Sequence, residues 1–159
     1  MTVFTKDEQW DNDYDLFVID NKGKIGRLCH FGERLLPPTI AKSRENLEKV
    51  EDHFVNLPDL KSGFIKCPDL LTHLDMANVG DFARYVYYFG EVSSRGLYTY
   101  DSYGPSYHKG RYFRVTIPKT ELSINDLPVE IKNILEELRL DSICFAEDSL
   151  IPEDVVRNL

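Results

Sequence analysis

The residue types that most often carry out chemistry are sparse and widely spaced in this chain of 159 residues. Three cysteines, Cys29, Cys67 and Cys144, are an odd number at long spacings, which indicates reduced, buried thiols rather than disulfides. No cysteine or histidine pair has the close spacing of a zinc site. The adjacent Cys29 and His30 would point to opposite faces of a strand, which argues against joint ligation. We therefore expect no catalytic residue, no metal and no cofactor.

Three short motifs resemble functional loops, and each lacks an essential part. The segment Asp11-Asn12-Asp13-Tyr14-Asp15 opens like a calcium loop, but Leu16 and Lys22 stand where that loop needs glycine and glutamate. Ser106 stands two residues after Gly104, as in a nucleophile elbow, but the second glycine of that motif is missing. The stretch from Gly23 to Gly26 is short and has no helix after it, unlike a phosphate-binding loop. These motifs predict no catalytic or metal chemistry.

Charge is distributed unevenly along the chain, whose formal net charge is −8. Residues 1–20 sum to −5 and residues 121–159 to −7, so residues 21–120 carry the remaining +4. An acidic protein is a poor general match for nucleic acid, which binds mainly through Lys and Arg. The two acidic segments instead predict a surface that attracts a basic protein. The acidic candidates for partner binding are Asp11, Asp13, Asp15, Glu136, Glu137 and Asp141.

Aromatic residues are concentrated in one part of the chain. Of 19 aromatic residues, 11 lie between Phe82 and Phe113. Those with helical spacing are expected to be core, whereas the others are candidate contact residues, because tyrosine is enriched at protein interfaces. The aromatic candidates for partner binding are Tyr87, Tyr88, Tyr103 and Tyr107.

Two antiparallel hairpins are predicted. Residues 14–20 and 24–31 are rich in strand-forming residues and flank Asn21-Lys22-Gly23, a tight turn. Residues 97–100 and 111–117 form a second pair, joined by a loop of about ten residues. Residues 142–146 are a possible C-terminal strand.

Helical periodicity is clearest at residues 43–57, 81–95 and 128–138. Shorter helices are expected after Pro68 and Pro152, where proline suits a first helical turn. The pattern as a whole predicts a single α+β domain over residues 1–159, with three or four helices covering one face of a mainly antiparallel sheet. The residues predicted to face the sheet are Leu47, Phe54, Phe82, Phe89, Ile131 and Leu135.

A family resemblance covers roughly residues 95–150. It is carried by the segments Arg95–Asp101, Tyr112–Pro118 and Asp126–Ile131. They resemble small acidic bacterial immunity proteins, which neutralise a partner toxin and have no active site. The resemblance implies a basic partner protein, such as a nuclease-type toxin, and assigns no functional residue.

Function is therefore expected to be non-catalytic binding in the cytoplasm, since no apolar run is long enough for a membrane span and no signal peptide is recognisable. Two alternatives remain open. One is a small hydrolase-like enzyme with a dispersed Asp/Glu/His site that includes His30 or His108. The other is a structural or regulatory subunit. A deep cleft with converging polar groups favours an enzyme, whereas an acidic, aromatic surface favours a binding protein.

Overall fold

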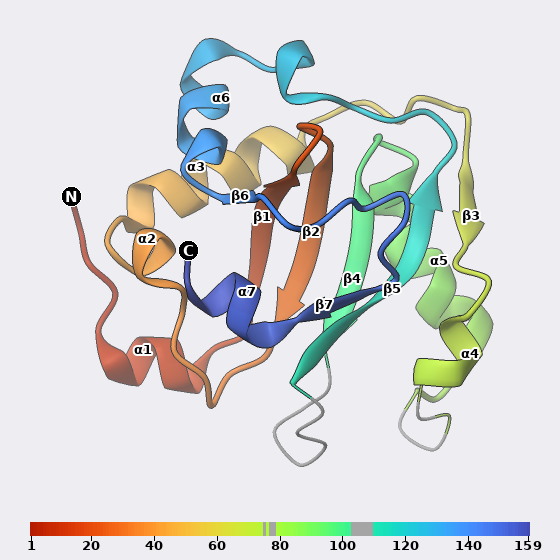
Figure 1. Cartoon of the computed structure of the whole chain (residues 1–159), viewed down its shortest axis with the longest axis horizontal. Coiled ribbons are helices and arrows are strands. Elements are labelled where there is room, and N and C mark those ends of the chain that lie inside the picture. The colour runs from red at the N-terminus through yellow and green to blue at the C-terminus, as the bar shows by residue number, and fades with distance from the viewer. Residues whose placement is uncertain (75, 77–78, 103–109) are drawn as a thin grey trace.

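The computed structural model describes residues 1–74, 76, 79–102 and 110–159, and shows an α+β fold built on one mixed, open sheet (Figure 1). The predicted residues Tyr103 and Tyr107 therefore lie outside the described part. The strands are β1 (Tyr14–Asp20), β2 (Ile25–His30), β3 (Phe64–Lys66), β4 (Tyr98–Ser102), β5 (Arg111–Pro118), β6 (Arg139–Leu140) and β7 (Leu150–Pro152).

Both predicted hairpins are confirmed. Strands β1 and β2 pair antiparallel, from Tyr14 opposite His30 to Ile19 opposite Ile25, and β4 pairs antiparallel with β5. The sheet order is β3-β5-β4-β2-β1-β6, with β7 added to β5. The two hairpins join through a parallel pairing of β2 with β4, and β6 adds to β1 in parallel. Strands β3 and β7 both pair antiparallel with β5, so antiparallel pairings predominate.

The three long helices occur where periodicity predicted them. Ser43 and Asp81 cap α3 and α5 with side-chain oxygens that accept hydrogen bonds from the backbone. The capping box from Thr5 to Glu8 starts another helix that periodicity missed. The helices are α1 (Lys6–Asp11), α2 (Pro38–Ala41), α3 (Arg44–Val55), α4 (Leu70–His73), α5 (Phe82–Ser93), the 3₁₀ turn η2 (Ile124–Asp126), α6 (Val129–Glu136) and α7 (Glu153–Arg157).

Helices α3 and α5 cover the same face of the sheet. Phe17 on β1 stacks on Phe54 of α3, with ring centroids 4.9 Å apart. Arg27, directly opposite Phe17 on β2, lies over the rings of Tyr88 and Phe89 on α5. Directly opposite residues share a face of a sheet, so β1 and β2 form a floor between the two helices.

Within α5, Gly90 allows a close approach to β3. A Cβ atom at this position would lie 2.2 Å from Cζ of Phe64, a distance that real side chains do not tolerate. Glycine destabilises the interior of a helix, but here it is the residue that lets α5 pack closely against the sheet. The six residues predicted to face the sheet are all buried or partly buried.

The C-terminal segment covers the opposite face of the sheet, where it passes in front of the strands in Figure 1. The strand predicted at residues 142–146 is wrong, because this part of the chain forms turns. Its backbone amides bond to side chains instead: Cys144 N–H donates to Asp148 and Phe145 N–H to Asp20. The apolar residues of this segment belong to the core: Ile143, Cys144 and Phe145 are buried, and the Phe145 ring packs onto Gly26 of β2.

Candidate functional site

A cleft of about 630 Å³ opens between α3 and α5, above the floor formed by β1, β2 and β4. Its volume lies within the roughly 300–1,000 Å³ of typical ligand sites. The lining combines carboxylates and tyrosines with one arginine. The cleft residues are Asp13, Tyr14, Asp15, Arg27, Cys29, His30, Phe31, Leu47, Glu51, Tyr85, Tyr88, Phe89 and Asp101.

Arg27 is fixed at the base of the cleft. Its Nη2 donates to both carboxylate oxygens of Asp15, at 2.9 and 2.8 Å, and to the hydroxyl of Tyr88 at 3.1 Å. The guanidinium carbon lies 5.3 Å from the centroid of the Tyr88 ring, which is a cation–π distance. The side chain is only 5% exposed, yet Nη1 has no partner among the described residues. The polar groups at the base of the cleft are therefore incompletely paired.

Two further carboxylates approach this base from the sides. Asp101 on β4 accepts a hydrogen bond of 2.7 Å from the Tyr85 hydroxyl. Burial raises the pKa of Asp101, and the charge of Asp15 adds to that effect. The pKa of Glu51 on α3 is also raised, by burial first and then by the charge of Asp15. A bound cation would relieve this repulsion.

The electrostatic balance of the cleft is negative. Asp13, Asp15, Glu51 and Asp101 oppose the single cation of Arg27, which leaves three formal negative charges if the histidine is neutral. Burial lowers the pKa of His30 to about 4, so the neutral form predominates at pH 7. The cleft can therefore attract a cationic group.

A smaller chamber of about 200 Å³ continues the cleft along β1. Asp15, Arg27 and Tyr88 line both spaces, so these three residues form the junction between them. Glu91 in the last turn of α5 and Arg95 just after the helix also line the smaller chamber. The cleft and the chamber together, which we call the α3/α5 groove, run in the direction of the strands.

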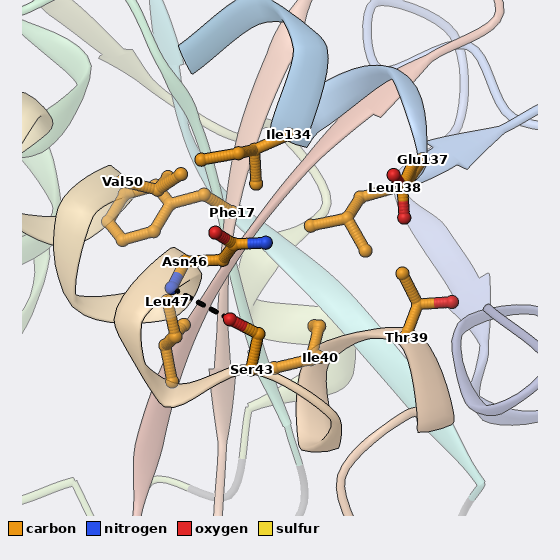
Figure 2. Close-up of a pocket in the computed structure, with 10 residues that line it drawn as sticks. All are labelled: Phe17, Thr39, Ile40, Ser43, Asn46, Leu47, Val50, Ile134, Glu137 and Leu138. Carbon is orange, nitrogen blue, oxygen red and sulfur yellow. Dashed lines mark hydrogen bonds between the residues drawn. The ribbon is translucent and has the colours of Figure 1, made fainter. Parts of the chain in front are cut away.

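A second pocket, between α2, α3 and α6, is too small to bind a ligand (Figure 2). Val50 of α3, Ile134 of α6 and Leu138 just after α6 line it, as the close-up shows. Its cavity volume is about 20 Å³, little more than the space of one water molecule. This pocket is a packing gap in the core.

Neither Cys29 nor His30 has the environment of a catalytic group. Burial raises the pKa of the Cys29 thiol, which disfavours the reactive thiolate. The His30 ring lies 3.0 Å from the Tyr112 hydroxyl through Nδ1, on the opposite face of the sheet from Cys29. The two side chains therefore cannot act together as a nucleophile and a base.

A second polar cluster joins α4 to the C-terminal segment. The Asp69 carboxylate accepts hydrogen bonds from the Cys67 thiol at 2.9 Å and the Ser149 hydroxyl at 2.6 Å, and His73 Nε2 lies 3.3 Å away. The serine hydroxyl thus donates to the carboxylate rather than to the imidazole, and burial raises the pKa of Cys67. This arrangement fixes α4 and activates neither the hydroxyl nor the thiol.

The structure brings together three of the predicted site residues, Asp13, Asp15 and Tyr88, in the cleft. Asp13 accepts a backbone hydrogen bond from Gly32, and Asp15 pairs with Arg27, so both have roles other than the calcium ligation considered above. Asp11 is exposed at the end of α1. Tyr87 is 60% exposed on α5 and does not line the groove.

The C-terminal acidic candidates lie elsewhere. Glu136 pairs with Arg139 and Glu137 with Lys42, whereas Asp141 is exposed just after β6. Strand β6 pairs with the far end of β1, at Ile19 and Asp20. Five residues of strand span about 17 Å between this end and Asp15. Glu136, Glu137 and Asp141 therefore lie near the end of β1 that is opposite to Asp15.

Four important residues of the cleft were not predicted: Arg27, Glu51, Tyr85 and Asp101. Tyr85 has the helical spacing that predicts a core residue, and no pattern in the sequence singles out Glu51. Arg27 and Asp101 are each the one Asp, Glu, Lys or Arg residue of their strand, so neither belongs to a charge cluster. Alternation places Asp15 and Arg27 on one face of the predicted hairpin, and this signal could have suggested their pairing.

Among the described residues, no group of three or more His, Cys, Asp or Glu side chains could hold a metal ion. None of the helices in these residues is both long and apolar enough to cross a membrane. The fold and the cleft thus define an α+β protein with an acidic, tyrosine-lined groove. No protein-family model matches the chain, nor does any curated protein or solved structure.

Proposed function

We propose that this chain is a non-catalytic binding protein that captures a basic partner protein in the α3/α5 groove. The observation that carries the proposal is the cleft itself, in which four carboxylates and three tyrosines surround one internally paired arginine. Such a surface attracts a cationic partner over long range and supplies aromatic contact area at short range.

Neutralisation of a toxin is the specific role that we propose for this capture. Toxins that act on nucleic acid must hold phosphates with basic residues, so an acidic protein can compete for that site. The sequence resemblance to immunity proteins supports the same role. Burial lowers the pKa of His30 to about 4, below the neutral range in which a general base titrates, and this favours binding over the hydrolase alternative. The other histidine of that alternative, His108, lies outside the described residues.

Capture from the native host tests this proposal. The wild-type chain is compared with the cleft variant, Asp13→Asn with Glu51→Gln, and with a charge-matched control, Glu136→Gln with Glu137→Gln. We expect wild type and control to retain the same basic protein at about 100 mM salt, whereas the cleft variant loses most of it. The captured protein is then expressed alone and with the chain, and we expect growth to be inhibited only when it is alone.

Two results would contradict the proposal. Equal retention by the cleft variant and the control would show that the groove is not the binding surface. Retention of an acidic or neutral protein through the groove would contradict the electrostatic argument. Circular dichroism of each variant checks that the fold is intact, which we expect because Asp13 and Glu51 are both exposed.

A further inference from the structure

We infer that the cleft receives an arginine side chain carried on an extended segment of the partner. This inference rests on the proposed function and specifies which group enters the groove. Three independent features of the cleft favour a guanidinium on a peptide over other cations: a carboxylate without a partner, an exposed tyrosine face and a buried donor without an acceptor.

The available carboxylate is Glu51. It is exposed, lines the cleft and has no hydrogen bond or ion pair among the described residues. By contrast, Asp15 is paired with Arg27, and Asp101 accepts from Tyr85 and from the backbone of Ser102. Glu51 and the rim residue Asp13 are therefore the acids that an incoming cation can reach. The fork of a guanidinium can donate to a carboxylate through two nitrogens, whereas an ammonium acts as a point charge.

The aromatic wall is supplied by Tyr88, which already packs against one guanidinium within the chain, that of Arg27. More than half of Tyr88 remains exposed, at 56%, so the ring can also contact a guest. A planar guanidinium stacks on aromatic rings and is more weakly hydrated than an ammonium. This wall therefore favours arginine over lysine.

The missing acceptor is the partner of Arg27 Nη1. This nitrogen is buried without a hydrogen bond among the described residues, in a side chain that is 5% exposed. The carbonyl oxygen of a peptide in the groove would accept a hydrogen bond from Nη1, whereas a cation without a carbonyl group has no such acceptor. Because Nη1 has no exposed surface, the side chains around it must move for a carbonyl to reach it. Arg27 stands at the junction of the cleft and the chamber, where an extended segment would pass.

Three capped tripeptides test the inference: Gly-Arg-Gly, Gly-Lys-Gly and Gly-citrulline-Gly. Citrulline keeps the shape of arginine without its charge, and lysine keeps the charge without the planar group. Binding is followed by amide chemical shifts of the ¹⁵N-labelled full chain. We expect saturable shifts for the arginine peptide around the cleft, at least threefold weaker binding for lysine, and no saturation for citrulline. Ethylguanidinium, which has no carbonyl, should also bind at least threefold more weakly than the arginine peptide.

Matched variants locate the site. Glu51→Gln and Tyr88→Ala should each weaken the arginine peptide about two- to fivefold, the range of exposed ion pairs and exposed cation–π contacts. Glu48→Gln on α3 and Tyr87→Ala on α5 are the controls and should leave its affinity unchanged. Equal affinity for arginine and lysine, or equal losses in the Tyr88 and Tyr87 variants, would overturn the inference.

The outcomes distinguish this inference from the proposed function. If the arginine peptide fails to saturate while the cleft variant still loses the captured partner, the arginine inference is wrong and the capture role stands. If the peptide binds as expected but the cleft variant retains the partner, the arginine site stands and the capture role in the groove is wrong.

Discussion

Replacing Phe145 with alanine is expected to lower the free energy of unfolding by about 3–5 kcal/mol, the usual cost of deleting a buried phenylalanine. Phe145 is fully buried and packs between the tyrosines of β4, with ring centroids 5.7 Å from Tyr98 and 5.6 Å from Tyr100. A Cβ atom on Gly26 would lie 2.7 Å from its ring, so the strand below has no side chain with which to fill the space. The cavity should therefore persist.

Urea denaturation measures this effect, with Tyr87→Ala as the control. Tyr87 is an exposed aromatic residue, and its loss should change the free energy of unfolding by no more than about 0.5 kcal/mol. The backbone bonds of residue 145, from its N–H to Asp20 and from Arg114 to its carbonyl, do not need the ring and should remain. A loss below about 1 kcal/mol for Phe145→Ala would show that the C-terminal segment is not part of the core.

Replacing Arg27 with alanine should cost about 3 kcal/mol of stability at pH 7. Removal of one partner from a largely buried ion pair leaves the other carboxylate uncompensated. We take the lower end of the usual range because Asp15 is 30% exposed and water can screen it. The variant also loses the cation that lowers the pKa of Asp101 and Glu51, so repulsion among the carboxylates increases.

The stability of this variant should depend on pH in a defined direction. A carboxyl group whose pKa is raised by folding binds protons more readily in the folded state, so stability rises as the pH falls. Without Arg27 the pKa values of Asp101 and Glu51 rise further, and the deficit should shrink as the pH falls from 7 towards 5. A double variant, Arg27→Met with Asp15→Leu, removes both charges and should recover at least half of the loss. A deficit that grows at pH 5 would contradict the account.

Much of the fold follows from local sequence patterns. The turn at Asn21-Lys22-Gly23 indicates the first hairpin, and the strand-forming runs at 97–100 and 111–117 indicate the second. The helical stripes indicate the three long helices. All of these elements are determined by residues close in the chain. The parallel pairings of β2 with β4 and of β1 with β6 could not be predicted in this way. They join distant segments and depend on how the helices pack on the sheet.

The error at residues 142–146 has the same origin. An apolar run bounded by turn residues is compatible with a buried strand, and periodicity does not distinguish a strand from a buried turn. The conformation depends on a side-chain acceptor. The carboxylate of Asp20, 125 residues earlier, accepts the hydrogen bond from the Phe145 N–H that a neighbouring strand would otherwise accept. A local sequence pattern cannot predict a hydrogen bond between residues so far apart in the chain.

The candidate site was predicted only in part for a similar reason. Local charge density pointed to Asp13 and Asp15, and aromatic density pointed to Tyr88. Glu51 and Asp101 are single acids in different elements, so neither contributes to a local cluster in the sequence. The floor formed by β1, β2 and β4 brings them together. Conversely, Glu136 and Glu137 are dense in sequence but are paired locally with Arg139 and Lys42.

Association kinetics with the captured partner test the central claim most directly. At about 50 mM salt, Asp13→Asn with Glu51→Gln should slow association about tenfold relative to wild type and reduce its dependence on salt up to about 500 mM, because electrostatic steering acts mainly on association rates. The charge-matched variant Glu136→Gln with Glu137→Gln changes the same net charge at the other end of β1 and should slow association less than twofold. Equal slowing by both variants, or none in the cleft variant, would contradict the claim that the α3/α5 groove receives the partner.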